Sequence, residues 1–127
     1  MRREDGSVSI VVAAVILLSL VLSMGLADVA RVLIARSHAR TAADAAALAV
    51  AQELVLPTGA DPAQVAARFA ALNGAVVTAC DCVTRSLEAT VGVTITVDGF
   101  LLIAGARSVV ARSRAVVDLP SAAPVTP

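Results

Sequence analysis

The feature that most constrains this chain is an uncharged run of twenty-two residues, residues 6–27. At about 1.5 Å of rise per residue, this run makes roughly 33 Å of helix, enough to cross a hydrocarbon layer of about 30 Å. No Gly or Pro then occurs before Pro57, and seven of the ten residues 42–51 are Ala, the strongest helix former. The sequence therefore predicts one long N-terminal helix, transmembrane over residues 7–27 and continuing outside the membrane over residues 28–56.

Residues 61–119 predict a small domain that begins with a short helix. Asp61 is a suitable N-cap, Pro62 fits the first helical position, and Gln64 lies three residues after the cap. Asn73-Gly74 is a typical stop signal. We expect the apolar face of this helix to consist of Val65, Phe69 and Leu72.

The second half of this domain predicts strands, because the hydrophobic period changes to two after Ala75. The clearest strand is Leu87–Asp98, and 76–83 and 108–119 predict two more, the first joined to it by a turn near Arg85-Ser86. The fold class is therefore α+β, with a long N-terminal helix, a short second helix and a three-stranded antiparallel sheet. The residues expected to point inward are Leu87, Ala89, Val91, Val93, Ile95, Val97, Val109, Ala111, Ala115 and Val117.

Three further segments complete the organisation of the chain. Residues 1–6 are a short charged leader, and residues 120–127 are a Pro-rich tail that we expect to be disordered. Residues 98–105 form an apolar loop between the second and third strands. The tip of this loop is expected either to cap the core or to touch lipid.

Composition argues against catalysis and against nucleic-acid binding. The ten basic residues, all Arg, balance ten acidic ones, and no basic cluster exceeds two residues, so a nucleic-acid partner has little electrostatic support. The chain has one His, no arguable nucleophile-and-base set and no phosphate loop. We therefore expect a protein that is not an enzyme and has no cofactor or metal site.

The first half of the chain resembles a known family. Gly6-Ser7 opens the apolar run, and residues 35–49 read Ala-Arg-Ser-His-Ala-Arg-Thr-Ala-Ala-Asp-Ala-Ala-Ala-Leu-Ala. Residues 6–51 thereby resemble the N-terminal region of Tad (tight adherence, Flp-type) pilus-assembly proteins of the TadE/TadG kind. The resemblance is greatest to the small TadE-like proteins of actinobacteria that are encoded near helicase and secretion genes.

This resemblance implies a pseudopilin-like accessory component of a Tad/Flp-type pilus or secretion assembly. Such a protein is non-catalytic and crosses the cytoplasmic (inner) membrane once, with its C-terminal domain outside the cytoplasm. Its implied partners are the lipid bilayer and other assembly subunits, with a homo-oligomer as a further candidate. Residues Arg40 and Asp44 are candidate subunit contacts, the alternative being an ion pair between them at i,i+4.

The resemblance also makes Gly6 and Ser7 candidates for leader cleavage. Prepilins are cut after a Gly and carry a Glu at the fifth position of the mature chain, where this chain has Val11. That Glu is costly in lipid and is kept for pairing with a neighbouring subunit. Its absence favours an anchored accessory protein over a filament subunit.

A secreted domain is the alternative interpretation. Gly25-Leu26-Ala27 satisfies the small-x-small rule, so Ala27 and Asp28 are candidates for signal-peptidase cleavage. Against cleavage, the apolar run exceeds the usual ~7–15 residues of a signal peptide core, and the helical pattern continues through the cut.

The two cysteines, Cys80 and Cys82, bear on the compartment but leave several states open. An even count outside the cytoplasm suggests a disulfide. In an extended strand, however, their Cα atoms lie nearly ~7 Å apart, at the edge of disulfide geometry. A local bridge, pairing with another chain and two free buried thiols all remain possible at this point.

Arg residues flank both ends of the apolar run, so charge does not set the orientation of this segment in a membrane.

Overall fold

The structure is a computed structural model that describes residues 5–83 and 86–118. Along the chain its elements are α1 (Asp5–Val55), α2 (Pro62–Leu72), β1 (Val76–Asp81), β2 (Glu88–Val97) and β3 (Arg107–Val116). The predicted α+β architecture is confirmed. The first four leader residues, Arg85 of the predicted turn and the tail 120–127 lie outside the described residues.

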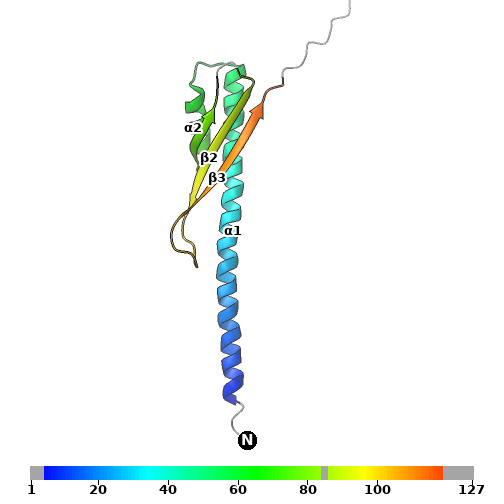
Figure 1. Ribbon diagram of the computed structural model, residues 1–127, viewed down its shortest axis with the longest axis vertical. Coiled ribbons are helices and arrows are strands. Elements are labelled where there is room, and N and C mark those ends of the chain that lie inside the picture. The colour runs from blue at the N-terminus through cyan, green and yellow to red at the C-terminus, as the bar shows by residue number, and fades with distance from the viewer. Residues whose placement is uncertain (1–4, 84–85, 119–127) are drawn as a thin grey trace, which may run out of the picture.

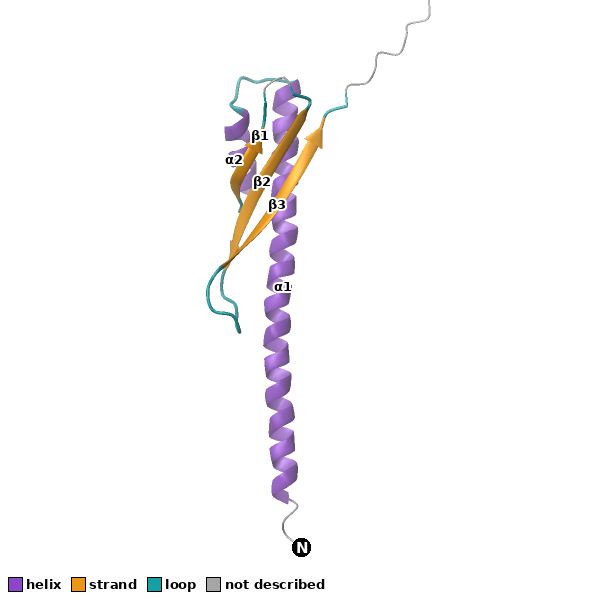
Figure 2. Ribbon diagram, in the orientation of Figure 1, coloured by secondary structure: helices purple, strands orange, loops and turns teal. Residues whose placement is uncertain are grey.

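Helix α1 is the axis of the molecule, and the sheet and α2 pack on its C-terminal half. Figure 1 shows the sheet and α2 beside the upper part of the helix, while the lower part stands alone. The three strands run obliquely along α1 and form one layer over it (Figure 2). Before Gly25, the side chains of α1 are exposed from Val8 through Met24, and the rest of the domain does not cover them.

The core is built from alanine and valine. The face of α1 from Ala39 to Ala51 is buried beneath the sheet and α2. The largest fully buried side chains are Val50, Val91 and Val93. Small side chains on α1 let neighbouring backbones approach closely, so a domain with two phenylalanines still excludes water from its centre.

Helix α2 presents alanines to this core, which corrects the expectation from the sequence. Its buried residues are Ala66 and Ala70, with Val65 half-buried. Phe69 remains 38% exposed and Leu72 is 72% exposed. The physical reason is that α2 packs on the alanine face of α1, and two helices that approach closely need small residues at the contact. As predicted, Asp61 caps the helix, its side chain accepting a hydrogen bond from the Ala63 N–H at 3.1 Å.

The sheet is antiparallel with order β1-β2-β3, so the best-patterned strand lies in the centre. Ala89, Val91 and Val93 are buried against α1, as the alternation predicts. Leu87 was expected to point inward but precedes β2 and is 47% exposed, because the strand begins only at Glu88. The inward residues predicted for the third strand are all buried or half-buried: Val109, Ala111, Ala115 and Val117.

A β-bulge distorts β1 opposite Gly92. The pairing register jumps between Val77, which faces Val93, and Ala79, which faces Gly92. A Cβ atom on Gly92 would lie 3.3 Å from the Thr78 hydroxyl oxygen. Glycine at this position therefore gives the bulged strand the room it needs.

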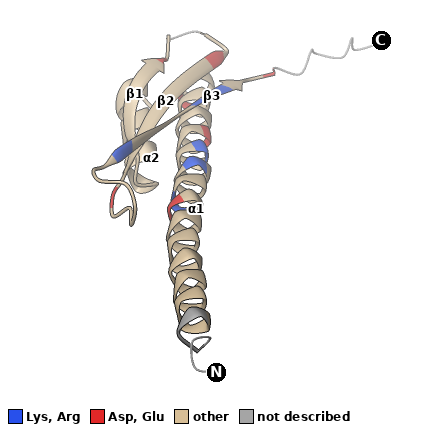
Figure 3. Cartoon of the chain, turned by 60° about the horizontal axis from the view of Figure 1, so that its bottom comes forward, with Lys and Arg blue, Asp and Glu red and all other residues tan. Residues whose placement is uncertain are grey.

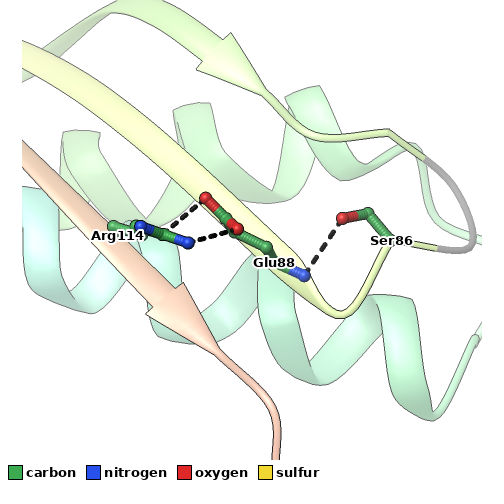
Figure 4. Close-up of polar contacts among 3 residues, drawn as sticks. All are labelled: Ser86, Glu88 and Arg114. Atoms are coloured by element: carbon green, nitrogen blue, oxygen red, sulfur yellow. Dashed lines mark hydrogen bonds and ion pairs between the residues drawn. The ribbon is translucent and has the colours of Figure 1, made fainter.

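Two carboxylates organise the far end of the domain. Glu53 accepts hydrogen bonds from the backbone of Thr58 at 2.6 Å, from its hydroxyl at 2.8 Å, and from the Gly59 and Ala60 N–H groups, which shapes the loop between α1 and α2. The hydroxyl bond from Thr58 is the main cause of the lowered pKa of Glu53. Glu88 pairs with Arg114 across β2 and β3 and accepts from Nη2 at 2.6 Å, while its backbone N–H donates to Ser86 (Figure 4).

The alanine contact between α1 and α2 predicts a sharp size limit at Ala70. Replacing this fully buried residue in Ala70→Leu should destabilise the domain by roughly 1–3 kcal/mol, because added methylenes overpack a close helix contact. Limited proteolysis and thermal melting of the detergent-solubilised protein measure the loss. The matched control is Ala71→Leu, at the exposed neighbouring position. Equal stability of the two variants would contradict the packing described here.

Candidate functional site

The N-terminal half of α1 is long and apolar enough to cross a membrane by length and composition. After its first turn, α1 carries charged residues only from Asp28 onward, and Figure 3 shows charged residues in the part of the helix nearer the domain. The apolar segment that is long enough to cross a bilayer therefore meets the domain at Asp28, the first charged residue after the uncharged run 6–27. This junction is the candidate functional site.

Asp28 fastens the loop between β2 and β3 to helix α1. Its two carboxylate oxygens accept hydrogen bonds from the backbone N–H groups of Leu101 and Leu102, at 2.8 and 2.9 Å. Asp28 is only 4% exposed, although it lies outside the main core. A loop 73 residues away in the sequence is thus held at the end of the apolar segment by a single carboxylate.

The charge of Asp28 is stabilised mainly by these two backbone donors. They lower the pKa of Asp28 below its ordinary value of 3.8, and the nearby positive charge of Arg31 lowers it further. Asp28 and Arg31, both within the described residues, do not form a direct ion pair. The Arg31 guanidinium instead lies beside Gly99, where a Cβ atom would be 3.7 Å from Nη1.

An apolar groove of about 300 Å³ lies between α1 and the fastened loop. On the helix side it begins at Gly25 and continues through Val29 and Val32. On the loop side it is formed by Phe100, Leu102 and Ile103, and Arg36 lies at its domain end. The loop therefore neither caps the core nor extends freely into solvent, because it lies against the helix at the end of the apolar run.

The structure joins Cys80 and Cys82 by a disulfide bond, with the two Cα atoms 5.4 Å apart. This distance is shorter than two residues of an extended strand span, and β1 accordingly ends between the cysteines, at Asp81. Both cysteines are half-buried and pack against the alanine core. Of the arrangements that the sequence left open, the structure therefore has the local bridge.

Arg40 and Asp44 lie on α1 beside the buried alanine face. Arg40 is exposed and Asp44 is half-buried, and within the described residues no ion pair joins them. The alanine face itself is covered by α2 and the sheet of the same chain. A partner subunit would therefore meet Asp44 from the side of the helix and not through the alanines.

The two candidate cleavage sites lie in different surroundings. Gly6 and Ser7 fall in the first turns of α1. Ala27 and Asp28 lie in the middle of the same uninterrupted helix, directly beneath the fastened loop.

Within residues 5–83 and 86–118, no group of three or more His, Cys, Asp or Glu side chains gathers where a metal ion would be held.

The fold and the site define a class of protein: a small α+β domain packed on the C-terminal half of a helix whose N-terminal half is long and apolar enough to cross a membrane. Comparison with known proteins agrees with this. Residues 6–53 match the family model described as putative Flp pilus-assembly TadE/G-like. The match covers the apolar segment, Asp28 and the whole alanine face of α1. No curated protein and no solved structure matches the chain.

Sequence reasoning missed the role of Asp28 in holding the loop. It placed this residue directly after the transmembrane segment and at a candidate cleavage site. One signal was available, because an acidic residue directly after a long apolar run needs hydrogen-bond donors to offset its desolvation. The donors themselves come from the backbone of the apolar loop 98–105, where the side chains give no hint of them.

We predict that Asp28→Ala frees the loop without unfolding the domain. The Leu101 and Leu102 N–H groups lose their acceptors, so hydrogen–deuterium exchange of peptides covering residues 98–106 should rise, while peptides from the core stay protected. Asp98→Ala is the control, because it removes an exposed carboxylate from the same loop. Unchanged exchange in Asp28→Ala would show that other contacts hold the loop.

The lowered pKa of Asp28 also predicts how the loop responds to pH. A carboxylate whose pKa is lower in the folded protein stabilises the fold above its ordinary pKa of 3.8 and loses this effect as the pH falls through the lowered value. Exchange in the loop, corrected for the intrinsic pH dependence, should therefore stay constant from neutral pH down to about the ordinary pKa of 3.8 and rise as the pH falls from there through the lowered value. A rise near pH 6 would contradict this assignment.

Proposed function

We propose that this protein is a membrane-anchored, pilin-like accessory component of a Tad/Flp-type pilus or secretion assembly, and that it has no catalytic role. The observation that carries the proposal is the family match over residues 6–53, which coincides with the exposed apolar half of α1 and its junction with the domain. Residues 7–27 form the transmembrane anchor, and other assembly subunits are the partners of the domain.

The proposed orientation places the domain outside the cytoplasm. The bridge between Cys80 and Cys82 supports this, because disulfides persist in oxidising compartments and are rare in the cytosol. The inner membrane is then the location of α1, which crosses it once.

Val11 supports an accessory role over a place in the filament shaft. In the structure this position is exposed on a bare part of α1, among other aliphatic side chains. A helix surface of this kind is satisfied by lipid alone and offers no buried charge to pair with the N-terminus of a neighbouring subunit.

A secreted domain is the second candidate, and one observation favours it. The side chains of residues 8–24 are all exposed, so the domain makes little use of the helix before Gly25. Cleavage after Ala27 would leave the alanine face and its partners intact. Against it, the Ala27–Asp28 bond lies within a continuous helix beneath the β2–β3 loop, where a protease has poor access.

The mature N-terminus decides between these functions. We expect mass spectrometry of a C-terminally tagged full-length protein to find it in the membrane fraction, beginning at Met1 for an uncut anchor or at Ser7 after prepilin-type processing. Protein in the medium that begins at Asp28 would overturn the anchor and favour the secreted domain.

We propose that Asp44 contacts a partner subunit. Within the described residues Asp44 forms no ion pair with Arg40, so its carboxylate is available to such a contact. We expect Asp44→Asn to leave the amount of membrane-inserted protein unchanged and to reduce pilus or secretion output in cells that depend on this protein. Asp118→Asn, an equal charge change at the exposed end of the domain, is the control. Loss of membrane insertion in Asp44→Asn would contradict a role confined to association.

A further inference from the structure

The β2–β3 loop presents an apolar tip at the level where the lipid-length segment ends. A Cβ atom on Gly25 would lie 3.5 Å from Leu102 Cδ1, so Leu102 contacts a residue inside the uncharged run. Gly25 precedes the end of that run by two residues, which is about 3 Å along the helix. Figures 1 and 2 show the loop extending below the sheet, beside α1, toward the bare half of the helix.

The tip exposes large apolar side chains that the domain does not cover. Leu101 is 52% exposed, Leu102 51% and Ile103 45%, and Phe100 is half-buried beside them. Four consecutive apolar residues in a loop are unfavourable in water. They lie beside the exposed apolar surface of α1, which begins at Val8 and continues past the loop to Val29, Leu33 and Ile34.

The charges around the tip are mainly positive and lie on its domain side. Arg36 and Arg107 line a second groove next to Phe100, and Arg31 lies beside Gly99 at the start of the loop. Two carboxylates lie nearby. The carboxylate of Asp28 accepts hydrogen bonds from the two backbone N–H groups, and Asp98 is exposed. An apolar tip below a set of arginines matches a bilayer surface, where acyl chains lie below phosphate groups.

We propose that the Phe100–Ile103 loop is a second membrane contact, which inserts into the leaflet around α1 while Arg36 and Arg107 face the phospholipid headgroups. Asp28 holds the loop at the right depth by fixing the Leu101 and Leu102 backbone to the helix. The satisfied N–H groups also make it less costly to bring this backbone into a medium without water. This inference rests on the proposed function, because it requires α1 to be anchored in a bilayer.

Tryptophan fluorescence tests the contact, since the chain has no Trp or Tyr and one introduced Trp is the sole indole. Three single variants of the full-length protein are reconstituted into vesicles of phosphatidylcholine with phosphatidylglycerol as the minor component. Leu101→Trp reports on the loop and Leu18→Trp on the anchor. Val116→Trp reports on an exposed site at the opposite end of β3. Each variant is measured with lipids brominated near the top of their acyl chains and with aqueous iodide.

We expect brominated lipid to quench Leu101→Trp and Leu18→Trp, and iodide to quench only Val116→Trp. Emission of Leu101→Trp should also shift to shorter wavelength on reconstitution. Quenching of Leu18→Trp by lipid, with Leu101→Trp quenched by iodide, would overturn the loop contact and leave the anchor standing. If Leu18→Trp also fails to respond to lipid, the proposed anchor itself is wrong.

A second copy of the chain is the other occupant that the test distinguishes. In that case Leu101→Trp is shielded from iodide without being quenched by brominated lipid, which would overturn the proposal. Leu101→Asp provides a measurement free of any preference of tryptophan for the membrane interface. In vesicles, Leu101→Asp should lower the protection of residues 98–106 from hydrogen exchange, whereas Val116→Asp, the matched control at the opposite end of β3, should not. Equal protection of the two variants would count against insertion.

Discussion

The close contact between α1 and the domain depends on alanine. The sheet and α2 do not enclose a core by themselves, because both pack on the face of α1 between Ala39 and Ala51. Large side chains on that face would hold the sheet away and leave Val91 and Val93 without contacts on one side. The domain is thus an attachment to a helix, and its stability depends on the helix being formed and straight across this region.

The junction at Asp28 joins the two environments of that helix. Below it, most side chains of α1 are aliphatic and exposed, and above it the helix has a buried alanine face and an outer face that carries both charged and aliphatic side chains. Asp28 suits this junction for two reasons. Backbone N–H donors stabilise its charge, and the same hydrogen bonds hold an apolar loop at the end of the apolar segment. The bridge between Cys80 and Cys82 lies in the domain above it, at the end of β1.

Periodicity predicted the architecture well, because its signals are local. The uncharged run, the absence of helix breakers and the alternation of β2 each depend on neighbours in the sequence. Predictions that required knowing which surfaces meet were less successful. Phe69 and Leu72 were expected on the apolar face of α2, but this helix packs on the alanines of α1 and buries Ala66 and Ala70 there. The Asp28 contact was missed for a related reason, since its partners are backbone groups 73 and 74 residues away.

Helix α1 has 51 residues and so extends for roughly 77 Å, and it contains no Pro. Gly25, the one Gly of α1 after its first turn, is braced by Leu102. A rod without a hinge transmits force and rotation along its length. A pull on the sheet would therefore reach the N-terminal half as tension along the helix axis, and a rotation of that half would swing the sheet and its loops around the same axis. The direction in which the domain faces is thereby set by the angular position of the apolar half.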